Sequence, residues 1–376
     1  MRRRKRTKRS PRRTEKPTGR KRLRVGLPAL LIAVLCAVVS LALYSETGFI
    51  SKPIPSKSIS EPKKATRKAR TLDDVLAMTP EQLAQLDIAE MNLLCATGLP
   101  GAEKIDISEC LATLDLWAER VRFETERHLY RLTDPRYKDH AEHYKHSEAR
   151  FRAEWLIAVL QQDIGLHYHA GFVPQDVAVP PFKTSRETFL HGLMDHDDPR
   201  KAFGGNCVSL PVAYAAVGRR LGYPVKLVSS KEHVFCRWEG KGHPNAAWRD
   251  RFNFDGAGNG FSIDPDAFYL TWPRKTTPDH VELCDLLTSL SPAEELSLFM
   301  SSRGHVLRCV RQDYAAALVA YAHAARLWPE SCQPLHWVFT MNGKLLERQR
   351  AAHPEAFRQV VARNAAARRA AEQSQK

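Results

Sequence analysis

The chain has 376 residues, of which 43% are hydrophobic, so it can build a sizeable core and is not a disordered polymer. Its net charge of +15 would suit a nucleic-acid binder, but the charge is unevenly distributed. Residues 1–24 hold 14 Lys and Arg against one acidic residue, and residues 45–70 hold seven against two. The rest of the chain is slightly acidic, with a net charge of −3, and we expect no nucleic-acid partner.

The first apolar segment is the uncharged run GLPALLIAVLCAVVSLALY, residues 26–44. Its length is close to the roughly 20 residues that a helix needs to cross a bilayer, which predicts one transmembrane helix and a membrane as partner. The alternative is a cleaved signal peptide, whose apolar region is usually only about 7–15 residues long. The denser positive charge before the run predicts a cytoplasmic basic tail, residues 1–25, and an extracytoplasmic folded domain, which in a bacterial cell means the periplasm.

Two segments of different character follow. Residues 45–70 contain SKPIPSKSISEPKKATRKAR, which is rich in Pro, Ser and Lys and lacks apolar periodicity, so we expect a disordered linker. Residues 71–165 carry apolar residues at helical spacing and predict a helical segment. The predicted helices begin at Thr79, Ser108 and Ser147. The first of them should run unbroken to Gly98.

Prolines and histidines mark residues 166–203 as irregular structure. His167 and His169, and the acidic MDHDD at 194–198, raise the question of a metal site. Their spacing fits no established zinc pattern, and no paired-cysteine motif accompanies them. We therefore expect no metal and no cofactor.

A helix and then strands follow this irregular segment. GGNCVSLPVAYAAVGRRLG, residues 204–222, has helical apolar spacing that opens at Cys207, and Gly222 ends it. Strand patterns follow in PVKLVSS (224–230), HVFCRWE (233–239) and RFNFDGAGNGF (251–261). The strands gather behind one helix, so the predicted fold class is α+β.

The C-terminal part, residues 291–352, returns to helices. Four of its residues match the second-helix positions of a tetratricopeptide unit, namely Ala317, Tyr321, Ala324 and Pro329. A simple pair of small-residue helices gives the same pattern, so both interpretations stay open; either could carry a protein partner. Residues 353–376 are expected to form a terminal helix that fades into a disordered tail.

The chain has eight cysteines, and Cys36 lies in the apolar run. Outside the cytoplasm, the other seven could form up to three disulfides and leave one odd thiol. Cys95 and Cys110 are a plausible loop-closing pair, and Cys207 is the candidate odd thiol. The sequence leaves the pairing open.

Cys207 has the surroundings that a nucleophilic cysteine needs. A cysteine attacks as a thiolate, and both a helix N-terminus and a nearby histidine favour that form. A carboxylate must then hold the histidine in the correct tautomer. His233 opens the alternating strand, and Asp255 lies in the next one. Asp264, in SIDPD, is an alternative third residue.

The order of Cys207, LGYPVKLV, HVFCRW and FNFDGAG resembles the transglutaminase-like superfamily, whose core is similar to papain-type cysteine peptidases. The resemblance is strongest over 203–275 and points to a bacterial group with a tetratricopeptide-like helical tail. By motif, Cys207 matches the nucleophile, His233 the base and Asp255 the orienting acid, although related bacterial sequences often have Glu at the third position.

This resemblance implies a core over residues 166–290 in which a nucleophile helix packs on a small antiparallel sheet. It also implies thiol-dependent acyl transfer on a peptide or protein substrate. Water as acceptor would make the chain a peptidase or amidase, and an amine acceptor would make it a crosslinking enzyme. The alternative is a non-catalytic, membrane-tethered binding module that uses the same groove, because some members of the group lack the cysteine.

Acyl transfer also needs hydrogen-bond donors for the oxyanion of the intermediate. The backbone amide of Cys207 is one candidate, and a side chain near FLHGL, residues 189–193, is a second.

Overall fold

The computed structural model describes residues 70–169, 182–194, 203–258 and 260–374. Within these ranges, no helix is both long and apolar enough to span a bilayer, so the predicted transmembrane helix finds no support there. The run at 26–44, the basic tail at 1–25 and almost all of the linker at 45–70 lie outside the described residues.

The α+β fold class expected from the sequence is wrong, because the described chain is mostly helical and carries one small antiparallel sheet. Helices α13 (Cys332–Ala352) and α14 (Pro354–Ser374) have 21 residues each, whereas the longest strand has eight. The helix expected within residues 353–376 is α14, which continues to Ser374, and residues 375–376 lie outside the described residues. Its sequence is rich in Ala, Arg, Gln and Glu, which are strong helix formers.

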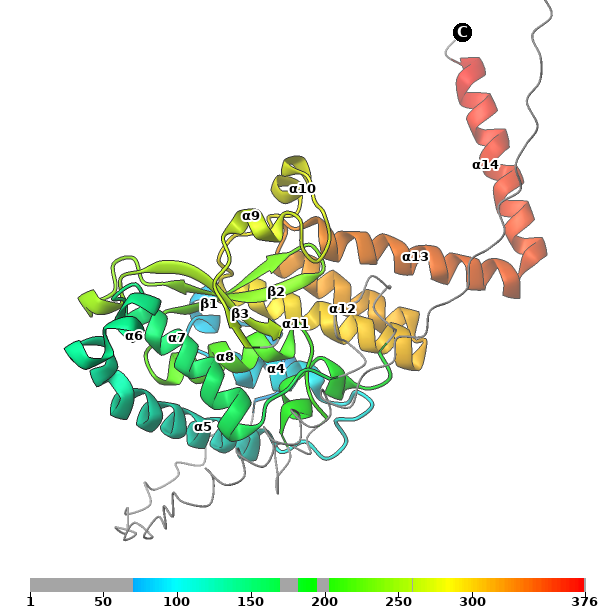
Figure 1. Cartoon of the computed structure of the whole chain (residues 1–376). Helices are drawn as coiled ribbons and strands as arrows, with labels where there is room; N and C mark the ends of the chain where they lie inside the picture. The colour runs from blue at the N-terminus through cyan, green and yellow to red at the C-terminus, as the bar shows by residue number, and fades with distance from the viewer. Residues whose placement is uncertain (1–69, 170–181, 195–202, 259, 375–376) are drawn as a thin grey trace, which may run out of the picture. The chain divides into compact units, whose positions relative to one another are not determined.

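The sheet contains β1 (Val225–Ser230), β2 (His233–Glu239) and β3 (Arg251–Gly258), extended by the short β4 (Gly260–Ser262). All neighbours are antiparallel, and the turn between β1 and β2 has only two residues, so Ser230 pairs with His233. Helix α8 (Ser209–Arg220) packs against β1, β2 and β3 (Figure 1). Alternate β2 side chains, Val234, Cys236 and Trp238, join the main core with α8.

The N-terminal helices are α2 (Leu72–Leu76), α3 (Pro80–Leu83), α4 (Ile88–Ala96), α5 (Ile107–His128), α6 (Lys138–His143) and α7 (Glu148–Ala158). The helix predicted to run from Thr79 to Gly98 is therefore two helices. Asp87 interrupts it, because its side chain accepts a hydrogen bond from the Ala89 amide at 2.8 Å and caps α4. The start predicted at Ser147 is confirmed, since Ser147 is the N-cap of α7.

The remaining helices are α9 (Asp266–Tyr269), α10 (Pro278–Leu283), α11 (Pro292–Val306), α12 (Tyr314–Leu327) and α13. Helix α11 packs on α4 and α12, and α12 packs on α13. Short 3-10 and π-helical segments complete the described chain at Leu129–Leu132, Pro135–Tyr137, Val159–Ile164, Ser185–Glu187, Leu190–Leu193, Ala246–Trp248 and Leu307–Arg311. The repeat-like residues of α12 form the contact with α11, where Gly304 leaves room for the Tyr321 ring.

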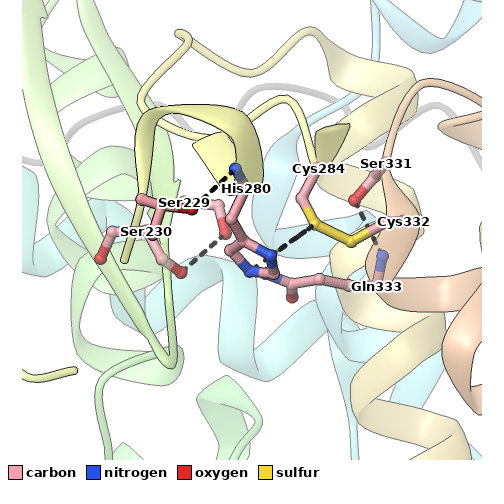
Figure 2. The surroundings of a disulfide bond; sticks show 8 residues. Ser229, Ser230, His280, Cys284, Ser331, Cys332 and Gln333 are labelled. Atoms are coloured by element: carbon pink, nitrogen blue, oxygen red, sulfur yellow. Dashed lines mark hydrogen bonds between the residues drawn. A yellow bond between two sulfur atoms is a disulfide. The ribbon is translucent and has the colours of Figure 1, made fainter. Parts of the chain in front are cut away.

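A disulfide between Cys284 and Cys332 joins the end of α10 to the first residue of α13 (Figure 2). The suggested pairing of Cys95 with Cys110 is wrong, because both thiols are free and buried. Cys95 faces α11, where its sulfur lies 3.8 Å from that of Met300. Packing between helices, rather than loop closure, explains this cysteine.

Candidate active site

Two glycines bring the chain tightly to the start of α8. Gly204 has φ +90°, which an L-residue rarely adopts, and a Cβ there would meet the His167 ring at 3.0 Å. A Cβ on Gly205 would lie 2.6 Å from the Ser209 hydroxyl and 2.7 Å from Leu193. Only glycine fits at these two positions, so the close packing of the chain there explains the GG of the GGNC motif.

Asn206 and Ser209 hold the turn that carries Cys207. The Asn206 side-chain oxygen accepts hydrogen bonds from the amides of Val208 at 2.8 Å and Ser209 at 3.1 Å. The Ser209 hydroxyl accepts in return from the Asn206 amide at 3.0 Å. Helix α8 thus begins two residues later than the sequence pattern indicated. Cys207 sits half-buried in the capping turn, where unpaired helical amides favour negative charge.

The β1–β2 turn brings His233 to Cys207. Glu232, the second residue of the turn, has φ +64°, and its carbonyl oxygen lies 4.0 Å from the Cys207 sulfur. The turn is held from outside by Arg274, which forms an ion pair with Glu232 at 3.0 Å, and by Lys231, which donates to the Lys275 carbonyl at 3.2 Å. His233 follows directly, near enough to Cys207 for that cysteine to contribute to the raised pKa of the histidine.

Asp255 orients His233 from the neighbouring strand. The His233 Nε2 and the Asp255 Oδ2 are 2.5 Å apart, and both residues are buried. The other carboxylate oxygen of Asp255 accepts from the Ala257 amide at 2.9 Å, which fixes the plane of the carboxylate. Because Nε2 of His233 hydrogen-bonds Asp255, Nδ1 is the ring nitrogen that can interact with the Cys207 sulfur. The acid that reaches His233 is therefore Asp255, whereas Asp264 lines a cavity with Phe261 and Arg150.

The Asp255 carboxylate controls the protonation of His233. Burial lowers the pKa of His233, because an imidazolium is costly to remove from water. The charge and hydrogen bond of Asp255, with a smaller contribution from Cys207, outweigh burial and raise the pKa to about 9. At neutral pH the ring therefore carries a proton that it can share with the sulfur.

Aromatic side chains enclose the histidine. The Trp272 ring meets the His233 ring edge to face at 4.8 Å, and Tyr269 stacks on Phe235 at 3.7 Å in the same cluster. These rings exclude water from the His233–Asp255 pair, and a lower local dielectric strengthens the attraction between its charges.

Sequence reasoning missed Tyr168. Tyr168 forms a parallel bridge with Gly205, and burial, followed by the charge of a Cys207 thiolate, raises the pKa of Tyr168. Tyr168 lies in the segment that we took for irregular structure, between two histidines that drew attention as metal ligands. Our second suggestion for an oxyanion donor, near residues 189–193, fails: its polar side chain, His191, is buried and bonded to Ser185 at 3.0 Å.

Potential metal ligands gather elsewhere in the described part of the chain. The ligand atoms of His280, Cys284 and Cys332 lie within 4.8 Å of one another. Figure 2 shows the His280 ring beside the Cys284 sulfur, 3.7 Å away. Both sulfurs are committed to the disulfide, so the group offers no thiolate for a metal in this state.

No family model, curated protein or solved structure matches the chain.

Proposed function

We propose that the chain is a cysteine-dependent acyl-transfer enzyme of the transglutaminase-like superfamily, acting on peptide or protein amides. The observation that carries the proposal is the buried His233–Asp255 pair, which follows directly on Glu232, whose carbonyl oxygen lies 4.0 Å from the Cys207 sulfur. A thiol, an imidazole and a carboxylate brought together in this order support activation of the thiol.

The reaction follows from these contacts. In the resting ion pair the proton of Cys207 lies on His233, and the thiolate attacks the carbonyl carbon of the substrate, forming a C–S bond while the carbonyl π electrons move to oxygen. When the intermediate collapses, the C–N bond breaks and the His233 imidazolium gives its proton to the leaving amine. Water or a second amine then attacks the thioester, His233 accepts its proton, and the C–S bond breaks to release Cys207 as the thiolate, which restores the ion pair. No oxidant or external cofactor enters this balance.

Site-resolved alkylation tests the activation of the thiol. Cys309 is an internal control, because it is also free and half-buried. We expect iodoacetamide to modify Cys207 at least about tenfold faster than Cys309 near pH 6, because the proposed imidazolium partner favours the reactive thiolate form. The His233→Ala variant should lose that advantage, as measured by mass spectrometry of the two peptides. A Cys207 rate that follows ordinary thiol titration, unchanged in His233→Ala, would contradict the proposal.

A second assay identifies the acceptor. Casein as acyl donor and dansylcadaverine as acyl acceptor give a fluorescent protein only if an amine resolves the thioester. Release of ammonia or new N-termini without fluorescence assigns hydrolysis instead. Cys207→Ala is the blank for both products. If wild type and blank agree under every condition while a peptide still binds, the groove serves binding rather than chemistry.

A further inference from the structure

A second group of chemically active side chains lies where α10 meets α13. The ligand atoms of His280, Cys284 and Cys332 are within 4.8 Å of one another. Figure 2 shows the His280 ring beside the disulfide, and each of its ring nitrogens is 3.7 Å from the Cys284 sulfur. The oxidised group has no thiolate, whereas the reduced group would offer two thiolates beside an imidazole.

The two helices place these side chains by local rules. Thr277 caps α10 by accepting a hydrogen bond from the His280 amide at 3.3 Å, and the Cys284 amide donates to the His280 carbonyl at 3.1 Å. Residues four apart on a helix are neighbours on its surface, which brings the imidazole to the Cys284 sulfur. Cys332 is the first residue of α13, where unpaired helical amides favour the thiolate form.

Hydrogen bonds other than the disulfide hold the same segments together. The buried Trp328 ring, just before α13, donates to the Asp285 carboxylate, just after α10, at 2.9 Å. The Leu287 amide donates to the Ser229 carbonyl at 2.8 Å and ties the segment after α10 to β1. The two cysteines therefore stay close to each other when the bond between their sulfurs is broken.

The spacing of the group fits a tetrahedral zinc ion. Zinc binds thiolate sulfur at about 2.3 Å and imidazole nitrogen at about 2.0–2.1 Å, so these two ligand atoms lie about 3.6 Å apart in a tetrahedral site. The 3.7 Å between the His280 ring nitrogens and the Cys284 sulfur agrees with that distance. The two sulfurs would have to part to about 3.8 Å, which rotation about their Cα–Cβ bonds allows.

We propose that His280, Cys284 and Cys332 bind a zinc ion when the disulfide is reduced, and that oxidation to the disulfide releases the metal. A small thiol or dithiol supplies the two electrons and two protons that convert the disulfide into two thiols, and is itself oxidised to a disulfide. Zinc then displaces the two thiol protons, and a neutral ring nitrogen of His280 binds beside the sulfurs. Water takes the fourth position that three protein ligands leave open. Either state links α10 to α13, so the link persists when the redox conditions change.

Cobalt reports on this site in the full chain. After reduction by a water-soluble phosphine, the protein should bind about one Co²⁺ per chain and show a thiolate-to-cobalt charge-transfer band, which Zn²⁺ removes because it binds more tightly. The oxidised protein should show no band. Cys207→Ala should keep the band, which separates this site from the candidate nucleophile. Loss of the band in that variant would place the metal at Cys207 and overturn the inference.

A matched pair of variants tests the histidine. His280→Ala should weaken Zn²⁺ binding by more than the roughly 10–100-fold that loss of a residue supporting a ligand costs. His336→Ala should leave binding unchanged, because the exposed His336 lies four residues from Cys332 but outside the group. A disulfide-linked peptide in oxidised His280→Ala, found by mass spectrometry, would show that α10 and α13 still meet in the variant.

Protection experiments on the wild type locate the metal without any variant. In the reduced chain, Zn²⁺ should slow iodoacetamide modification of Cys284 and Cys332, and diethylpyrocarbonate modification of His280, by at least about tenfold. Cys309 should not be protected. Three results would each overturn the inference: no metal binding by the reduced wild type, equal binding by the two histidine variants, or no protection of the three ligands.

Discussion

Two regions of the molecule are built in opposite ways. One is the sheet together with α8, and the other is the pair of C-terminal helices α13 and α14. Around the sheet, even charged groups are buried. Arg237 is fully buried and donates to Asn253 and Asp266 at 2.6 Å each, and to the Leu287 carbonyl at 3.0 Å. In α13 only Pro334 and Met341 are buried. Long helical segments there rely on local helix formation rather than on a core.

This difference shows where precise geometry can be maintained. A buried charge persists only if every partner is held in place, so the network around the sheet restricts motion. The candidate catalytic residues lie on these restricted elements. The long C-terminal helices have few such constraints, and we expect no catalytic residue on them.

The largest effect should come from breaking the acid–base pair. In Asp255→Asn the amide can no longer favour the correct protonated form of His233, so Cys207-dependent release of p-nitrophenolate from p-nitrophenyl acetate should fall on the order of 10³–10⁴-fold. Asp264→Asn is the matched control and should leave the rate unchanged. A larger loss in Asp264→Asn would mean that the third residue is misassigned.

The next largest effect concerns the disulfide that links the two regions. Cys284 and Cys332 are 48 residues apart, and closing a loop of that length contributes about 4 kcal/mol through the entropy of the unfolded chain. We expect Cys284→Ser to lower the free energy of urea unfolding by about 2–4 kcal/mol. Dithiothreitol should lower it similarly in wild type and not in the variant. Equal sensitivity of both proteins to the reductant would argue against the bond.

Replacing the buried Arg237 directly tests the difference between the sheet region and the C-terminal helices. Arg237→Met leaves the Asn253 side-chain oxygen without its donor and removes the charged partner of Asp266, which keeps only the hydrogen bond from the Asn253 side chain. It should destabilise the protein by about 3 kcal/mol. The control is Arg348→Met in α13, whose guanidinium lies 4.0 Å from the Tyr314 ring centroid. Its cost should stay below about 1 kcal/mol. Similar costs for both variants in urea unfolding would remove the distinction between the regions.

The pH dependence of stability tests the charge on His233. Its folded pKa of about 9 lies above the value of about 6.5 for an unfolded histidine. The stabilisation is therefore complete below about pH 6.5 and is lost as the pH rises through about 9. The difference in unfolding free energy between wild type and His233→Gln should decline across that interval, by about 3 kcal/mol. A difference that grows with pH would mean that the histidine is neutral in the fold.

The smallest effect should follow removal of α14. Its residues 354–373 are exposed except for a half-buried Phe357. A chain ending at His353 should change by less than about 1 kcal/mol in urea unfolding and keep the Cys207 alkylation rate. A larger loss would show that α14 packs more tightly than its exposure indicates.

The candidate triad could be found from the sequence because each residue carries a local signal. Cys207 follows a glycine pair before a helix pattern, His233 opens an alternating strand, and Asp255 precedes a glycine turn in the next strand. Antiparallel pairing of adjacent strands then brings the last two together without further information.

Other features depend on contacts that no local pattern encodes. Tyr168 reaches Cys207 only because its backbone pairs with Gly205, far along the chain. The break at Asp87 was hidden by continuous helical periodicity, and the pairing of Cys284 with Cys332 depends on where α10 and α13 meet. The fold class failed because short strands have strong patterns, whereas the residues in helices are far more numerous.

The antiparallel register has a consequence for how this chain can vary in length. The two residues between β1 and β2 set which face His233 occupies, and adding one residue there would turn the ring away from Asp255. The exposed residues 244–247, between β2 and β3, are outside that constraint. Natural insertions, or a reporter peptide introduced by an engineer, should therefore be accepted between β2 and β3 and rejected between β1 and β2.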